Sequence, residues 1–168
     1  MADDDGPQVH PRVRAQLERT PADGSHGEIL ALWKAHSIAE DARDLDGLIA
    51  TLSPDCVYEL VGELAGPENR WEGHDGARRF YTEFLGAFPD VEFFLQDITI
   101  GPQGVTEIAR VRGTHVADFA GWTATGEPVE FMVVIVFPWD PTTRRFGGER
   151  VLAVPPDPST APGAESVD

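Results

Sequence analysis

Residues 129–137 read VEFMVVIVF, one acidic side chain among eight apolar ones. Because successive side chains of a strand point to opposite faces, this composition puts apolar groups on both faces. An antiparallel strand ordinarily keeps one face in water. The segment therefore predicts a strand whose second face is covered, either as the wall of a pocket or by a partner chain.

The segments on either side predict helices first and further strands after them. An apolar stripe with helical spacing begins after Ser25, whose spacing to Glu28 is that of a capping box, and two more helices are expected with Asp44 and Asp75 as N-caps. Pro54 is expected to end the second helix. Alternating patterns then predict strands at 56–64, 91–100, 105–115, 129–137 and 144–154.

This order of elements indicates an α+β fold. Three helices from the N-terminal half are expected to pack on one face of a curved, mainly antiparallel sheet. A sheet wrapped around helices makes a cone that is open at one end. A cone lined by side chains is a natural pocket for a small molecule.

The length and composition suit one domain. The chain has 168 residues, 41% of them hydrophobic, enough for one real core. Residues 1–24 and 155–168 are rich in charge, Pro and Gly, and are predicted to be flexible tails around a folded body at 25–154. The lone Cys56 excludes an internal disulfide and is expected in the core.

The charge balance argues against several partners. The 13 Lys and Arg residues against 29 Asp and Glu residues give a net charge of −16, which repels phosphate backbones and anionic membranes. No nucleic-acid or membrane partner is expected. A signal-peptide core and a membrane-length apolar run are both missing, so a cytoplasmic protein is expected.

Three segments carry a resemblance to a known family. They are GHDGARRFYTEFLGAFPDVEF (73–93), VRGTHVADFAG (111–121) and TGEPVEFMVVIVF (125–137). In this order, and with the predicted elements, the chain resembles the SnoaL-like polyketide cyclases of the nuclear transport factor 2-like superfamily over roughly 26–153. The resemblance implies an aldol cyclisation in an apolar cone, with a buried carboxylate as acid/base and no metal or organic cofactor. The same cone also hosts isomerases, hydrolases, dehydratases and binding modules, since a fold does not fix a function.

The sequence departs from the family pattern where the acid is expected. By the resemblance, Ile135 stands at the place of an Asp that points into the cone, and Leu60 at the place of a catalytic base. The last strand reads GGERVLAV where an acidic or aromatic tail is usual. The pocket wall is therefore expected to be alkyl, and any proton transfer has to come from another side chain.

His36 is the first candidate for that transfer. It shares a helical stripe with Trp33, and the resemblance puts it at the place of a Tyr acid; an imidazole titrates near neutrality. A core histidine bonded to a backbone carbonyl is the alternative. Tyr58 and His115 are candidates to hold a substrate oxygen. For His115, the alternative is a purely structural role in the turn that follows it. The residues expected to line the pocket are Trp33, Leu60, Phe84, Trp122, Phe131, Val133 and Ile135.

Other polar residues are expected to be structural. His74 is expected in a turn, and Arg110 and Arg112 are expected to pair with acidic groups on neighbouring strands. No histidine pair has helical i, i+4 spacing, so no metal site is predicted.

Two functions stay open. The first is an enzyme of the polyketide cyclase or ketosteroid isomerase type, acting on a hydrophobic, carbonyl-bearing small molecule. The second is a non-catalytic ligand-binding or dimerisation module that kept the fold and lost the acid. In either case, the apolar second faces of 129–137 and 146–154 predict a homodimer.

Overall fold

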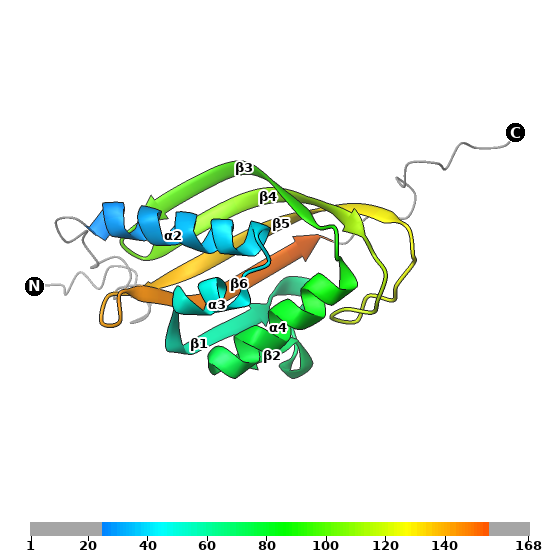
Figure 1. Cartoon of the computed structure of the whole chain (residues 1–168), viewed down its shortest axis with the longest axis horizontal. Coiled ribbons are helices and arrows are strands. Elements are labelled where there is room, and N and C mark those ends of the chain that lie inside the picture. The colour runs from blue at the N-terminus through cyan, green and yellow to red at the C-terminus, as the bar shows by residue number, and fades with distance from the viewer. Residues whose placement is uncertain (1–24, 155–168) are drawn as a thin grey trace, which may run out of the picture.

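The computed structural model describes residues 25–154, so both predicted tails lie outside the described residues. The elements are α2 (Ser25–Asp41), α3 (Leu45–Ala50), β1 (Leu52–Leu60), β2 (Arg70–Glu72), α4 (Gly73–Ala87), β3 (Glu92–Gly101), β4 (Gly104–Thr114), β5 (Pro128–Asp140) and β6 (Arg145–Val154) (Figure 1). Two short 3-10 turns, Gly62–Leu64 and Pro67–Asn69, connect β1 to β2.

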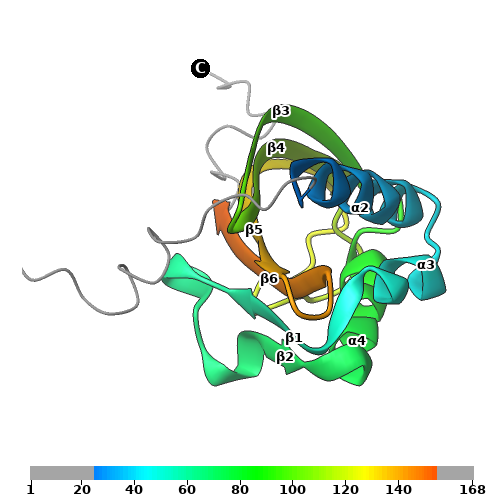
Figure 2. The same ribbon diagram turned by 90° about the vertical axis from the view of Figure 1, so that its left-hand side faces the viewer.

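The six strands form one curved sheet in the order β2-β1-β6-β5-β4-β3. β1 runs parallel to β6, and the other neighbouring strands are antiparallel. Figure 2 shows the sheet curling around an interior that α2, α3 and α4 close from one side. The expected α+β cone, with three helices on a mainly antiparallel sheet, is confirmed.

The helix boundaries confirm one capping prediction and correct two. Asp44 does cap α3, since its carboxylate accepts a hydrogen bond from the Gly47 N–H at 3.0 Å. The capping box at Ser25 is wrong, because its buried hydroxyl has no hydrogen-bond partner within residues 25–154. Asp75 is not the cap of α4 but lies in its first turn, where a carboxylate still complements the helix dipole.

The first two strands also differ from expectation. α3 ends at Ala50, so Pro54 lies inside β1 and does not end a helix. β1 therefore begins at Leu52, which pairs with Phe146 of β6. The segment expected to be only turns contains β2, three residues long, which pairs with β1. A strand this short gives no alternating pattern to detect.

The two apolar faces of β5 have different surroundings. Phe131, Val133, Ile135 and Phe137 point inward and are buried. Met132 belongs to the opposite face and is 38% exposed. One apolar face therefore lines the interior, and the other is the outer surface of the sheet.

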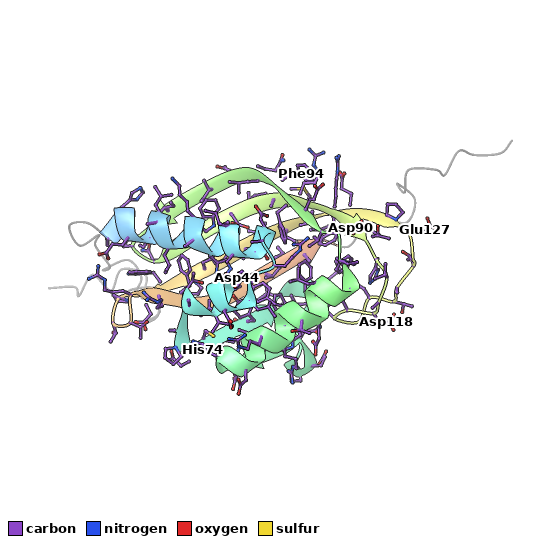
Figure 3. The ribbon with its side chains drawn as sticks, viewed as in Figure 1. Asp44, His74, Asp90, Phe94, Asp118 and Glu127 are labelled. Atoms are coloured by element: carbon purple, nitrogen blue, oxygen red, sulfur yellow. The ribbon has the colours of Figure 1, made fainter. Side chains whose placement is uncertain are left out.

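The polar residues expected to be structural have structural contacts. Arg110 and Arg112 both pair with Glu130 of β5, Arg112 at 2.5 Å and Arg110 at 3.6 Å. His74 does not precede the helix in a turn, as expected, but lies in the first turn of α4 (Figure 3), where its Nε2 atom is 3.2 Å from the Leu52 carbonyl oxygen. Cys56 is fully buried. None of the helices between residues 25 and 154 is both long and apolar enough to cross a membrane.

Candidate functional site

The interior of the cone contains a cavity with a mostly apolar wall. The space between its lining atoms is about 530 Å³ including the mouth, but only about 40 Å³ of it can hold the centre of a water-sized sphere. The cavity is thus a narrow slot, and a ring-sized ligand needs lining side chains to move. The long β4–β5 connection, where Figure 3 labels Asp118 and Glu127, contributes Phe119, Ala120 and Trp122 to the wall.

Most of the residues expected in the pocket wall line this cavity. They are Leu60, Phe84, Trp122, Phe131, Val133 and Ile135. Trp33 does not line it. Its indole Nε1 instead donates a hydrogen bond to Glu107 Oε2 at 2.8 Å.

Two carboxyl groups, Glu40 and Glu149, also line the cavity. The expectation of a wall without a carboxylate is therefore wrong. Neither residue stands at a place where the family pattern puts its acid, because Glu40 comes from the last turn of α2 and Glu149 from β6. Ile135 and Leu60 remain alkyl parts of the same wall.

A β-bulge turns Glu149 inward. From Val136 to Trp139 β5 advances three residues, while the paired stretch of β6, from Arg150 back to Phe146, covers four. The extra residue lies at Gly147–Gly148 and reverses the alternation, so that buried Phe146 is followed by buried Glu149. Gly148 has φ +97° and lies so close to β1 that a Cβ would be 2.0 Å from the Val57 oxygen.

Glu149 is held by a buried hydrogen-bond network. Its Oε1 atom accepts a hydrogen bond from the Tyr81 hydroxyl at 2.7 Å and lies 3.1 Å from His36 Nε2. Tyr58 lies 3.0 Å from the Tyr81 oxygen, and His36 Nδ1 lies 2.7 Å from the Thr51 hydroxyl. The contacts from Tyr81 and His36 both reach Oε1, and Glu149 also lines the cavity.

The two tyrosines of this network remain hydrogen-bond donors. Burial, followed by the nearby Glu149 carboxylate, raises the pKa of Tyr58 and of Tyr81 well above the ordinary value of 10.0. The Tyr81 hydroxyl donates to Glu149, and Tyr58 has side-chain hydrogen bonds with both Tyr81 and Glu149. The network therefore converges on Glu149.

Glu40 lies in a different environment. Its carboxyl makes no hydrogen bond or ion pair with any residue between 25 and 154. Burial, followed by Glu149, Glu107 and Asp41, raises the pKa of Glu40 well above its ordinary value of 4.5. The C-terminal end of α2 adds its negative dipole to the same effect. These effects favour the neutral, protonated form of Glu40, against an opposing contribution from Arg43.

A third interior carboxyl lies near the site without lining the cavity. Burial raises the pKa of Glu107 to about 7, while the hydrogen bond from Trp33 lowers it and Glu149 raises it. Glu107 points inward from β4 beside Ile135 of β5. No group of three or more His, Cys, Asp or Glu side chains in the described part of the chain is arranged to hold a metal ion.

The three candidate catalytic residues lie behind the cavity wall. His36 and Tyr58 are buried in the network and do not line the cavity. His115 is also buried, and its ring stacks on Phe88 with 4.7 Å between centroids. The structure thus brings His36 and Tyr58 together around Glu149 and keeps His115 apart, against a lining phenylalanine.

Sequence reasoning missed Glu40 and Glu149 for separate reasons. Glu40 follows the helix stripe at i+4 from His36, but a Glu at a helix end is ordinarily a solvated residue. Counting alternate residues from Phe146 would place Glu149 on the outer face. The paired glycines before Glu149 were the available signal, because Gly inside a strand pattern often marks a bulge.

A curled sheet closed by three helices over an apolar cavity with buried carboxyls defines a nuclear transport factor 2-like cone. Residues 33–140 match the SnoaL-like domain, and the chain belongs to this family. No curated protein has a sequence that matches this chain.

Several solved structures share the fold. The "putative SnoaL-like polyketide cyclase" from Jannaschia sp. CCS1 is 17% identical, with a TM-score of 0.65 over 88% of this chain and 91% of that one. AclR, a "putative hydroxylase" from Streptomyces galilaeus, is 23% identical, with a TM-score of 0.59 over 76% and 79%. IdmH, a "putative polyketide cyclase" from Streptomyces antibioticus, is 22% identical, with a TM-score of 0.58 over 74% and 91%.

Proposed function

We propose that this protein abstracts a proton next to the carbonyl group of an uncharged hydrophobic molecule, the step that begins an aldol cyclisation or a double-bond isomerisation. One observation carries the proposal. Two carboxyl groups line one apolar cavity in unlike environments, and such a pair divides into an acid and a base. The names of the SnoaL-like neighbours support the cyclisation.

Glu149 is the base in this proposal. The hydrogen bond from Tyr81 and the contact with His36 hold its carboxyl group in place at Oε1. The carboxylate removes a proton from the carbon next to the substrate carbonyl, and the C–H electron pair becomes the C=C bond of an enol. His36 and Tyr58 then act on Glu149 from behind the wall, as positioning residues that do not touch the substrate.

Glu40 is the acid. Its proton passes to the carbonyl oxygen as the enol forms, so the substrate gains one proton and loses one. In a cyclisation, the enol carbon then attacks a second carbonyl of the same molecule, whose oxygen takes the proton from Glu149 while the enol hydroxyl returns its proton to Glu40. In an isomerisation, Glu149 returns its proton to another carbon, and the enol hydroxyl again returns its proton to Glu40.

The lining also selects the charge of the ligand. Among residues 25–154, no Lys, Arg or His side chain lines the cavity, and two carboxyls do. An anionic ligand would lose its hydration without gaining a counter-charge. An uncharged ketone or ester fits this wall, and a free carboxylate does not.

Acetophenone provides a test that needs no knowledge of the natural substrate. Its methyl protons exchange with D₂O only through the enol, and NMR measures the rate. We expect the protein to accelerate this exchange, and Glu149→Gln and Glu40→Gln to lower the acceleration about 100-fold. Benzoate is the matched anion and should not compete. Unchanged exchange in both variants would remove this assignment.

A binding module is the second candidate function. The alkyl side chains of Ile135 and Leu60 at the family's acid positions, and the narrow cavity, favour it. In that case acetophenone quenches the fluorescence of Trp122, which lines the cavity, but no deuterium enters its methyl group. The same sample therefore separates the two functions.

We further propose a homodimer formed through the outer face of the sheet. The register places Arg110, Met132 and Val154 side by side across three strands, and Ile108, Val134 and Leu152 beside them. Met132, Leu152 and Val154 are 38%, 39% and 56% exposed, which is costly in water for one contiguous patch.

The cytoplasmic location stays a prediction.

A further inference from the structure

Thr51 lies at the far end of the network from the cavity, and its hydroxyl has only one hydrogen to give. The Thr51 Oγ1 atom is 2.6 Å from the Leu48 carbonyl oxygen and 2.7 Å from His36 Nδ1. A carbonyl can only accept, so the hydroxyl hydrogen goes to Leu48. Toward His36, the same oxygen can then only accept. His36 therefore carries a hydrogen on Nδ1.

The opposite ring nitrogen, Nε2, faces two oxygen atoms. His36 Nε2 lies 3.1 Å from Glu149 Oε1 and 2.9 Å from the Tyr81 oxygen. The single Tyr81 hydrogen goes to Glu149 at 2.7 Å. The Thr51 contact and these two contacts together fix the orientation of the ring, with Nε2 facing the Glu149 carboxyl.

We infer that Thr51 is a positioning residue of the site, which fixes the His36 proton on Nδ1 and thereby keeps Nε2 directed at Glu149. Thr51 and His36 are 3% and 1% exposed, so water does not replace this contact. Without the acceptor, a neutral ring gains by moving its hydrogen to Nε2 and leaving Nδ1 bare. The effect of Thr51 on rate rests on the proposed function, whereas its effect on the ring does not.

Nitrogen NMR of protein labelled with ¹⁵N-histidine tests the ring directly at pH 7, because protonated and bare ring nitrogens have distinct shifts. We expect a protonated Nδ1 on His36 in the wild type and in Thr51→Ser, and a bare Nδ1 in Thr51→Val. Urea unfolding verifies that each variant is folded. A bare Nδ1 in the wild type, or a protonated Nδ1 in folded Thr51→Val, would overturn the inference.

Acetophenone exchange supplies the kinetic part. Thr51→Val should lower kcat about tenfold and leave KM within twofold, because the substrate touches Glu149 and not Thr51. Thr51→Ser should restore kcat to within twofold of wild type. Equal kcat in wild type and Thr51→Val, with wild-type exchange measurable, would refute the positioning role. If neither the wild type nor any variant accelerates the exchange of acetophenone, the proposed function fails. The NMR result still shows which ring nitrogen of His36 carries the hydrogen.

Discussion

Glu40 follows His36 by four residues on α2, and the two side chains lie on the same face of the helix one turn apart. The imidazole is enclosed by Thr51, Tyr81 and Glu149, while the carboxyl lines the cavity. One helix therefore supplies both the partner of the base and the acid. Because His36 and Glu40 are one helical turn apart, His36 can contact Glu149 while Glu40 lines the same narrow cavity. Two carboxyls in unlike environments therefore lie on one wall.

Glu107 should make stability depend on pH. The folded protein keeps the Glu107 proton up to about pH 7, whereas the unfolded chain releases it above the ordinary value of 4.5. The folded state thus binds more protons in this window, and stability falls as the pH rises, by about 3 kcal/mol in all. Glu107→Gln can still accept from Trp33 and should flatten this loss. Urea unfolding at pH 5 and pH 8 measures it, with exposed Glu63→Gln as control; parallel curves for both variants would contradict the prediction.

Removing the two buried tyrosine hydroxyls should have unequal costs. Tyr81 contacts Glu149, His36 and Tyr58 through its oxygen, whereas Tyr58 contacts only Tyr81 and Glu149 among these network residues. We expect Tyr81→Phe to lower the free energy of unfolding by about 2–3 kcal/mol and Tyr58→Phe by about 1 kcal/mol. The variants delete the same atom from fully buried rings, so each is the control for the other. Equal losses in denaturant unfolding would mean that the network is not centred on Tyr81.

The glycine pair that forms the bulge should tolerate alanine at one position only. A Cβ on Gly148 would lie 2.0 Å from the Val57 oxygen, and φ +97° is strained for any other residue. Gly148→Ala should therefore cost at least about 2 kcal/mol. A Cβ on Gly147 meets nothing closer than 3.6 Å. Thermal unfolding of the two variants compares them, and a tolerated Gly148→Ala would argue against this close approach of β1 and β6.

The outer face of the sheet should control oligomeric state. Leu152→Glu and Met132→Glu each place a charge inside the exposed apolar patch, and we expect either to convert a dimer into a monomer. Ile38→Glu is the matched control, because Ile38 is 68% exposed on α2, among the helices. Light scattering at micromolar concentration gives the mass. A monomeric wild type, or a dimer in all three variants, would rule out this interface.

The local pattern of the sequence was sufficient for most elements. Apolar periodicity predicted α2 and α4, Asp44 marked the start of α3, and alternation predicted β3, β4, β5 and β6 to within a few residues. These features depend on neighbours in the chain, which the sequence displays. β2 was missed because three residues carry no period, and Pro54 was misplaced because Leu52 suits a helix or a strand equally well.

The sequence by itself determined the cone and much of its apolar wall, since each depends on which side chains avoid water. Tertiary structure alone decided the polar site. Glu149 faces inward because a bulge beside β1 reverses the alternation of side chains along β6, and the pKa of Glu40 is raised because distant segments remove it from water and place Glu149 and Glu107 nearby. Such effects arise from contacts between residues far apart in the chain, and no local pattern encodes them.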